Sequence, residues 1–144
     1  MIVNFVFDKM SAEKTGKAVG NININHNFNI TDVELTEIAF QGSKPALKIL
    51  FEFRVDYEPK IGSVEMNGHL VYYDNEEEIK KLQTQWKKEK KLSTGLTTLV
   101  ANTILSKANI KALILSQEVN LPPQIQLPKV MPAMSPDKKS EYIG

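Results

Sequence analysis

The sequence contains no cysteine. This absence excludes disulfides, thiolate nucleophiles, iron–sulfur clusters and cysteine-ligated zinc. It also fits a reducing compartment, so we predict a cytoplasmic location. No apolar run approaches the roughly 18 residues that a membrane span needs. The start of the chain, MIVNFVFDKM, lacks the basic region that opens a signal peptide. We therefore expect neither a membrane segment nor a secretory leader.

An excess of charge of either sign is also missing. The chain has 18 Lys+Arg against 17 Asp+Glu, a net charge of +1 over 144 residues. This balance argues against a nucleic-acid binder that uses its whole surface. The length is enough to bury a core without a disulfide or a metal. We predict one α+β domain over residues 1–131 and a flexible tail over residues 132–144.

Apolar and polar residues alternate along four segments, which predicts β-strands. These segments are 2–10, 21–31, 46–58 and 63–73. In the second one, every odd position from Asn21 to Asn29 is asparagine. After Asp32 the apolar residues move to odd positions, which predicts a bulge near Thr31–Asp32. The short connections favour an antiparallel sheet, and one apolar face per strand predicts that helices cover one side only.

The period of the pattern becomes helical after Asp74-Asn75, either of which can be an N-cap. The first helix has a narrow apolar stripe of Ile79, Leu82 and Trp86, typical of a surface helix. A second helix is predicted from about residue 96 to residue 117, covering the sheet with Leu96, Leu99, Val100, Ile104, Ala108 and Leu115, widened by Leu105 and Ala112. Five of the seven prolines follow in 121–136, which predicts an extended segment.

Catalytic and metal-binding patterns are weak. His26 and His69 have no neighbouring ligands at metal-site spacing. We expect His26 to be half-buried with a hydrogen-bond partner, the alternative being a metal ligand or general base. Glu52, Asp56 and Glu58 share one strand face, where a solvated row of carboxylates is commoner than an acid–base pair. We therefore predict no enzymatic activity, no cofactor and no metal.

Two further patterns leave alternatives open. Trp86 followed by the lysines of 87–91 is a combination found in binders of single-stranded nucleic acid. The same lysines suit a helix C-terminus, and the chain has a single arginine, so nucleic acid is not the expected partner. The asparagine row of 21–29 is either a solvated face or an oligomer or peptide-docking surface.

Three stretches carry a resemblance to a known family. They are LFEFRVDYEPKIGSVEMNGHLVYY, LTTLVANTILSKANIKALI and VNLPPQIQLPKV, which together cover most of residues 2–131. The order of four antiparallel strands, two helices and a proline-containing apolar exit resembles the SecB-like chaperone family. The resemblance implies a four-stranded antiparallel sheet followed by two helices packed on one face. It also implies a homo-oligomer, a dimer or tetramer, that holds unfolded polypeptides in apolar grooves.

On this resemblance the predicted function is a non-catalytic chaperone for unfolded or extended polypeptides. The alternative is an oligomer of the same fold that binds one dedicated partner, such as an antitoxin, or a small ligand. Aromatic and flexible apolar side chains suit varied clients. The candidate polypeptide-binding residues are Phe28, Tyr72, Tyr73, Trp86, Leu127, Val130, Met131 and Met134. The neutral charge and the short end of this chain differ from the acidic export chaperones of the family and do not favour delivery to the SecA motor.

Overall fold

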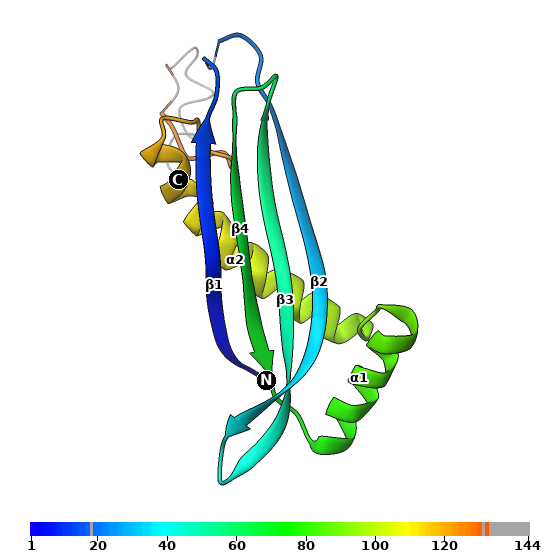
Figure 1. Cartoon of the computed structure of the whole chain (residues 1–144). Coiled ribbons are helices and arrows are strands. Elements are labelled where there is room, and N and C mark those ends of the chain that lie inside the picture. Colours follow the sequence, from blue (N-terminus) through cyan, green and yellow to red (C-terminus); the bar gives the residue numbers. More distant parts are fainter. Residues whose placement is uncertain (18, 131, 133–144) are drawn as a thin grey trace.

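The computed structural model describes residues 1–17, 19–130 and 132. It has four long strands in one antiparallel sheet, followed by two helices that lie on one face of that sheet (Figure 1). This confirms the predicted fold class and element order. The elements are β1 (Ile2–Lys14), β2 (Asn23–Ala39), β3 (Ser43–Glu58), β4 (Gly62–Tyr72), α1 (Glu76–Glu89) and α2 (Thr94–Glu118).

The strands lie in the order β1-β4-β3-β2, and every neighbouring pair is antiparallel. β1 and β2 are therefore the two edges of the sheet. The predicted bulge is confirmed, because the register of β2 on β3 shifts between Ile30 and Asp32. Beyond this bulge the β2–β3 hairpin continues to Ala39 and Ser43, further than predicted. Gly42 closes the turn of this hairpin with a φ of 99°, a backbone conformation that favours glycine.

The core forms between β3, β4 and α2. The odd positions of β3 from Leu47 to Tyr57 are buried on the helix side, and each large apolar side chain so buried stabilises the fold by roughly 1.5–3 kcal/mol. The facing residues of α2 recur every fourth position: Leu96, Val100, Ile104, Ala108, Ala112 and Ser116. The predicted burial of Leu99 is wrong, because Leu99 is 45% exposed. At about 100° per residue, it lies a quarter-turn away from the inward row.

α1 begins where the sequence predicted. The side chain of Asn75 caps it by accepting a hydrogen bond from the backbone N–H of Glu78 at 2.9 Å. The predicted stripe of Ile79, Leu82 and Trp86 is buried against the lower part of β2 and β3. In the part of the chain that the structure describes, neither helix is both long enough and apolar enough to cross a membrane.

Candidate functional site

A groove of about 450 Å³ opens at the β2 edge, where the turn between α1 and α2 passes the strand (Figure 1). Its walls come from three parts of the chain that are far apart in sequence. They are Phe28, Asn29 and Ile30 of β2, Trp86 of α1, and Lys90, Lys91, Leu92, Thr94, Thr97 and Thr98 of the turn and the start of α2. Three consecutive residues of β2 line it, and β2 is an edge strand of the sheet.

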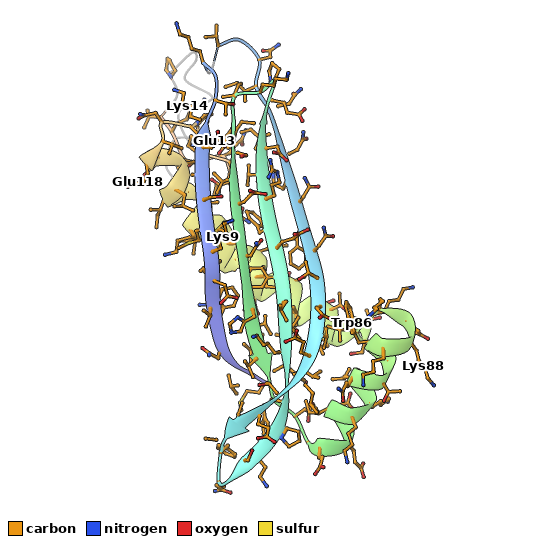
Figure 2. All side chains as sticks on the ribbon, viewed as in Figure 1. Lys9, Glu13, Lys14, Trp86, Lys88 and Glu118 are labelled. Atoms are coloured by element: carbon orange, nitrogen blue, oxygen red, sulfur yellow. The ribbon has the colours of Figure 1, made fainter. Side chains whose placement is uncertain are left out.

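Trp86 forms a fixed wall of this groove. Its indole Nε1 donates a hydrogen bond to Oδ1 of Asp32 at 3.3 Å. The same oxygen accepts from the backbone N–H of Val33 at 2.8 Å, so the β2 bulge positions the acceptor. Lys90 Nζ lies 5.7 Å from the centroid of the indole ring, close enough for a cation–π interaction. Trp86 is buried, and Figure 2 shows it between β2 and α1.

The floor of the groove is apolar and its rim is basic. Phe28 and Ile30 are half-buried, although they are on the helix side of β2. Lys90 and Lys91 stand at the rim, and none of the lining residues is acidic. The lining also holds no histidine, so it offers no general base of the usual kind. Chemically, the groove suits a large apolar side chain with a negative charge close by.

The structure brings two of the predicted polypeptide-binding residues together. Phe28 and Trp86 line the same groove. Tyr72 and Tyr73 lie at the far end of β4, where the Tyr72 hydroxyl donates to Asp74 at 2.9 Å and the Tyr73 ring packs on Phe40. Burial, helped by this bond to Asp74, raises the pKa of Tyr72 to about 12.

Leu127 and Val130 lie beyond the C-terminal end of α2, away from the groove. The proline segment is first fixed to the core, since the Tyr57 hydroxyl donates to the carbonyl of Pro122 at 2.7 Å. Gln124 is buried beside it and donates from Nε2 to the carbonyl of Asn109 at 2.6 Å. From Ile125 onward the apolar side chains are exposed. Met131 and Met134 lie outside the described residues.

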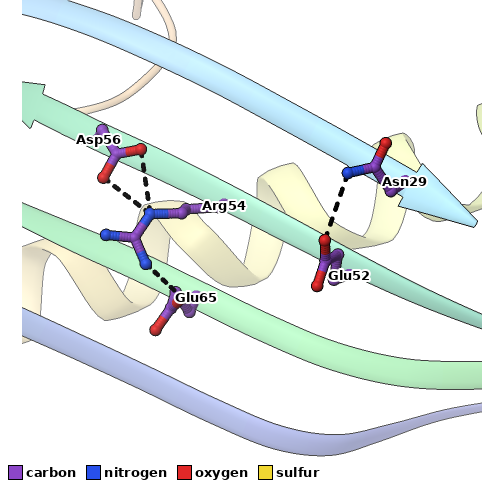
Figure 3. A network of polar contacts seen from close by, with 5 residues as sticks. All are labelled: Asn29, Glu52, Arg54, Asp56 and Glu65. Carbon is purple, nitrogen blue, oxygen red and sulfur yellow. Dashed lines mark hydrogen bonds and ion pairs between the residues drawn. The ribbon is translucent and has the colours of Figure 1, made fainter. Parts of the chain in front are cut away.

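The other face of the sheet is polar and carries an ion-pair network (Figure 3). The Arg54 guanidinium bonds to Asp56 at 2.8 Å and also pairs with Glu65, while Asn29 donates to Glu52 at 3.3 Å. Chiefly through the bond to Asp56, the pKa of Arg54 is raised. The carboxylates of Glu52 and Asp56, weighed above as an acid–base pair, are thus each bound to a neighbour. Among the described residues, no cluster of three or more potential metal ligands is present.

The two histidines differ in environment. His69 is on the polar face, where its Nδ1 lies 2.7 Å from Oδ2 of Asp8. His26 is on the apolar parity of β2, but it is exposed and touches the Phe53 ring at 6.3 Å between centroids. The expectation of a half-buried His26 with a hydrogen-bond partner is therefore wrong. The helix layer does not reach that part of the β2 edge.

Of the remaining walls, Asn29 belongs to the asparagine row that the sequence left open as a docking surface, whereas the others were not predicted as part of a polypeptide site. Ile30 was assigned to a strand and Leu92 to no feature, while Lys90 and Lys91 were considered only for nucleic acid or for the helix end. The bulge near Asp32 was the available signal, because bulges often lie beside functional sites and redirect side chains. The bulge could not indicate which helix would contact β2 at that point.

With this geometry in place, the fold is that of the SecB-like chaperones. A SecB-like chaperone of Mycobacterium tuberculosis, determined in complex with a ChAD peptide from the HigA1 antitoxin, superimposes with a TM-score of 0.61. The match covers 90% of this chain and 89% of that chain at 11% sequence identity, so it shows a common fold. No protein-family model and no curated protein matches the sequence.

Proposed function

We propose that this protein is a non-catalytic chaperone that binds unfolded or extended polypeptides in the β2-edge groove, without a cofactor. The observation that carries the proposal is the groove itself, an apolar floor with a basic rim at an open strand edge. The proposal is also supported by the fold that this chain shares with a chaperone solved in complex with a peptide.

The side chains of the groove suit clients of varied sequence. Phe28 and Trp86 offer broad aromatic surfaces, whose contacts depend on area more than on exact shape. The methylene stems of Lys90 and Lys91 can pack on apolar groups while their ammonium groups remain in water. Neither interaction requires one particular residue in the partner.

A second candidate function is binding of one dedicated partner, such as an antitoxin. The favouring observation is that the structural neighbour holds a peptide from an antitoxin. The range of clients distinguishes the two functions. A general chaperone binds many unrelated unfolded proteins with similar affinity, whereas a dedicated one binds a single sequence much more tightly than the rest.

We also propose that the chain forms a homo-oligomer, a dimer or tetramer, through the outer face of α2. Ile110 and Ile114 are 62% and 48% exposed and lie on the same side of the helix as Leu99. From Leu99 this side continues through Thr103, Ser106, Ile110, Leu113 and Gln117, the four-and-three spacing of a helix–helix seam. Lysine at both Ile110 and Ile114 should lower the mass measured by light scattering after gel filtration.

The binding function is tested with a permanently unfolded, carboxymethylated polypeptide labelled for fluorescence anisotropy. Replacing Phe28 with serine removes the aromatic floor, so we expect affinity to fall about tenfold. Ile24→Ser is the matched control, because Ile24 is half-buried on the same side of β2 but does not line the groove. Equal affinity of both variants and the wild type would contradict the assignment of this groove.

A further inference from the structure

The positive charge of the chain is concentrated in one helix and the turn that follows it. Residues 80–91 hold six of the 18 Lys+Arg residues and a single acidic residue, Glu89. This segment carries a charge of +5 in a chain whose net charge is +1, and all of its lysines are exposed. The negative end of a helix attracts lysines only in the last turn. Lys80 and Lys81 lie in the first half of α1, so the helix end does not account for them.

The lysines of α1 form two rows on its outer side. At about 100° per residue, Lys80 and Lys87 form one row along the helix. Lys81 and Lys88 form the second row, about 100° further round, with Thr84 between the rows. A shallow hollow of about 540 Å³ is lined by Thr84 and by lysines of both rows. Figure 2 shows Lys88 on the side of α1 that faces away from the sheet, so this surface is uncovered.

Most of this charge has no partner within the protein. Nζ of Lys80 lies 3.2 Å from Oε1 of Glu76, an exposed pair one turn apart. Lys81, Lys87 and Lys88 form no ion pair with any other residue that the structure describes. The side chains of these three lysines are therefore available to an anion from outside.

The burial of the apolar side of α1 narrows the choice of anion. Trp86 is 7% exposed, so its ring cannot stack on the bases of a single strand. Ile79 and Leu82 are buried as well, so α1 has no apolar face to insert among lipid headgroups. A phosphate backbone requires neither feature, because lysines contact it as point charges.

We propose that the outer side of α1 binds the backbone of double-stranded DNA, with the helix lying in the major groove. That groove is about 12 Å wide and admits an α-helix. Lys80 and Lys87 then face one phosphate backbone, and Lys81 and Lys88 face the other. The major groove of an RNA duplex is too narrow to be entered in this way. The near-zero net charge argues only against a binder that uses its whole surface, whereas this site uses one helix.

The DNA site is separate from the β2-edge groove. None of the four lysines in the two rows lines that groove. The site therefore does not depend on the proposed function, and one molecule can hold a polypeptide and DNA at the same time.

The salt dependence of binding tests the number of phosphate contacts. A labelled DNA duplex of mixed sequence is titrated by fluorescence anisotropy at about 50 to 200 mM salt. Four lysine–phosphate contacts predict a slope of log affinity against log salt of roughly −3.6, which is a loss of about a hundredfold over this range. No binding at the lower salt concentration would overturn the proposal.

A pair of double variants tests the position of the site. Lys81→Gln with Lys88→Gln removes one row and keeps good helix formers at both positions. We expect the slope to become shallower by about 2 and the affinity at low salt to fall about tenfold or more. The control is Lys9→Gln with Lys14→Gln, which removes the same charge from exposed residues of β1 (Figure 2). Equal losses in the two double variants would show that net charge alone acts, and would overturn the site.

Competition distinguishes DNA from other anions. An RNA duplex, a single DNA strand and vesicles of anionic lipid are each added to the protein with labelled DNA duplex bound. We expect unlabelled DNA duplex to compete best, and equal competition by any of the other three would overturn the proposed geometry.

The carboxymethylated polypeptide of the previous test separates the two proposals. Its binding should be unchanged in the variant that lacks Lys81 and Lys88. If the polypeptide does not bind but DNA binds as predicted, the proposed function is wrong and the DNA site stands. If the polypeptide binds and DNA does not, the DNA site is wrong and the proposed function stands.

Discussion

The two edges of the sheet are built in opposite ways. β1 carries Lys9, Glu13 and Lys14 along its length (Figure 2), and its register on β4 shifts twice. β2 has no charge over 21–31 and shifts once, at the point where it meets α1. Charges and bulges on an edge strand such as β1 oppose its unselective pairing with other chains. The absence of such guards on β2 exposes the chain to aggregation, which makes sense if that edge is used for binding.

The largest expected effect is on the free energy of unfolding, and it concerns the packing of β1 against the core. The Phe51 ring packs against Phe5 and Phe7 of β1, at 5.3 and 6.2 Å between centroids. Phe51→Ala should cost about 3–5 kcal/mol of unfolding free energy, measured by denaturant titration. Hydrogen exchange should then increase in β1 before β2. Phe53→Ala, which opens the core below β2, should reverse that order, and the same order in both variants would contradict the account.

Trp86 connects α1 to the β2 edge through its bond to Asp32. Trp86→Phe keeps an aromatic ring but removes the indole N–H, so we expect a loss of about 1 kcal/mol in unfolding free energy. The same change in an Asp32→Ala background should cost less, because the acceptor is already gone. A full loss in both backgrounds would show that the indole contributes through packing alone.

A charge placed on each edge in turn compares them directly. Asn25 lies opposite Asp56, and Ser11 of β1 lies opposite Glu65, so lysine at either position gains a similar cross-strand partner. Asn25→Lys should weaken client binding about fivefold, close to 1 kcal/mol, since a lysine on an edge strand opposes the close approach of another chain. Ser11→Lys should leave it unchanged. Equal losses in anisotropy titrations would remove the distinction between the edges.

The smallest expected effect is a pH dependence of the free energy of unfolding. It comes from groups near the start of β1, where Ile2 pairs with Tyr72. The backbone N–H of Asn75 and then the Tyr72 hydroxyl lower the pKa of Asp74, so its contribution is present at neutral pH and lost as the pH falls below about 4. The pKa of Tyr72 is raised, so its contribution is lost as the pH rises from about 10 toward 12.

Tyr72→Phe should reduce both of these pH dependences in denaturant titrations. Tyr73→Phe is the control, because the ring contact of Tyr73 with Phe40 does not use the hydroxyl. A steeper or unchanged pH dependence in Tyr72→Phe would contradict the assigned bond.

Local patterns predicted much of this fold. The alternation that ends at Ile30, a cap at Asp74 or Asn75 and the stripe that ends at Trp86 depend on neighbours in sequence. Each is confirmed, with Asn75 as the cap. The pairing of β1 with β4 depends on contacts across the whole chain, so no local pattern contained it. Leu99 is exposed because of the direction in which α2 crosses the sheet. The apolar stripe in the sequence does not fix that direction.

The candidate site was predictable only in part, for the same reason. Phe28 and Trp86 were chosen for their chemistry, and the β2 bulge brings them to one groove. Leu127 and Val130 were chosen on the same grounds. Neither of them lines the groove, and both follow α2 in the chain. Whether they belong to a client site in an oligomer stays a prediction.

The central claim is that the chain holds unfolded polypeptides, and suppression of aggregation tests it most directly. A slow-folding client is diluted from denaturant into increasing amounts of the protein, and light scattering is followed. The account predicts suppression that saturates at a defined ratio of protein to client and is weakened by Phe28→Ser but not by Ile24→Ser. Unchanged scattering with several unrelated clients, from a sample shown to be folded, would contradict it.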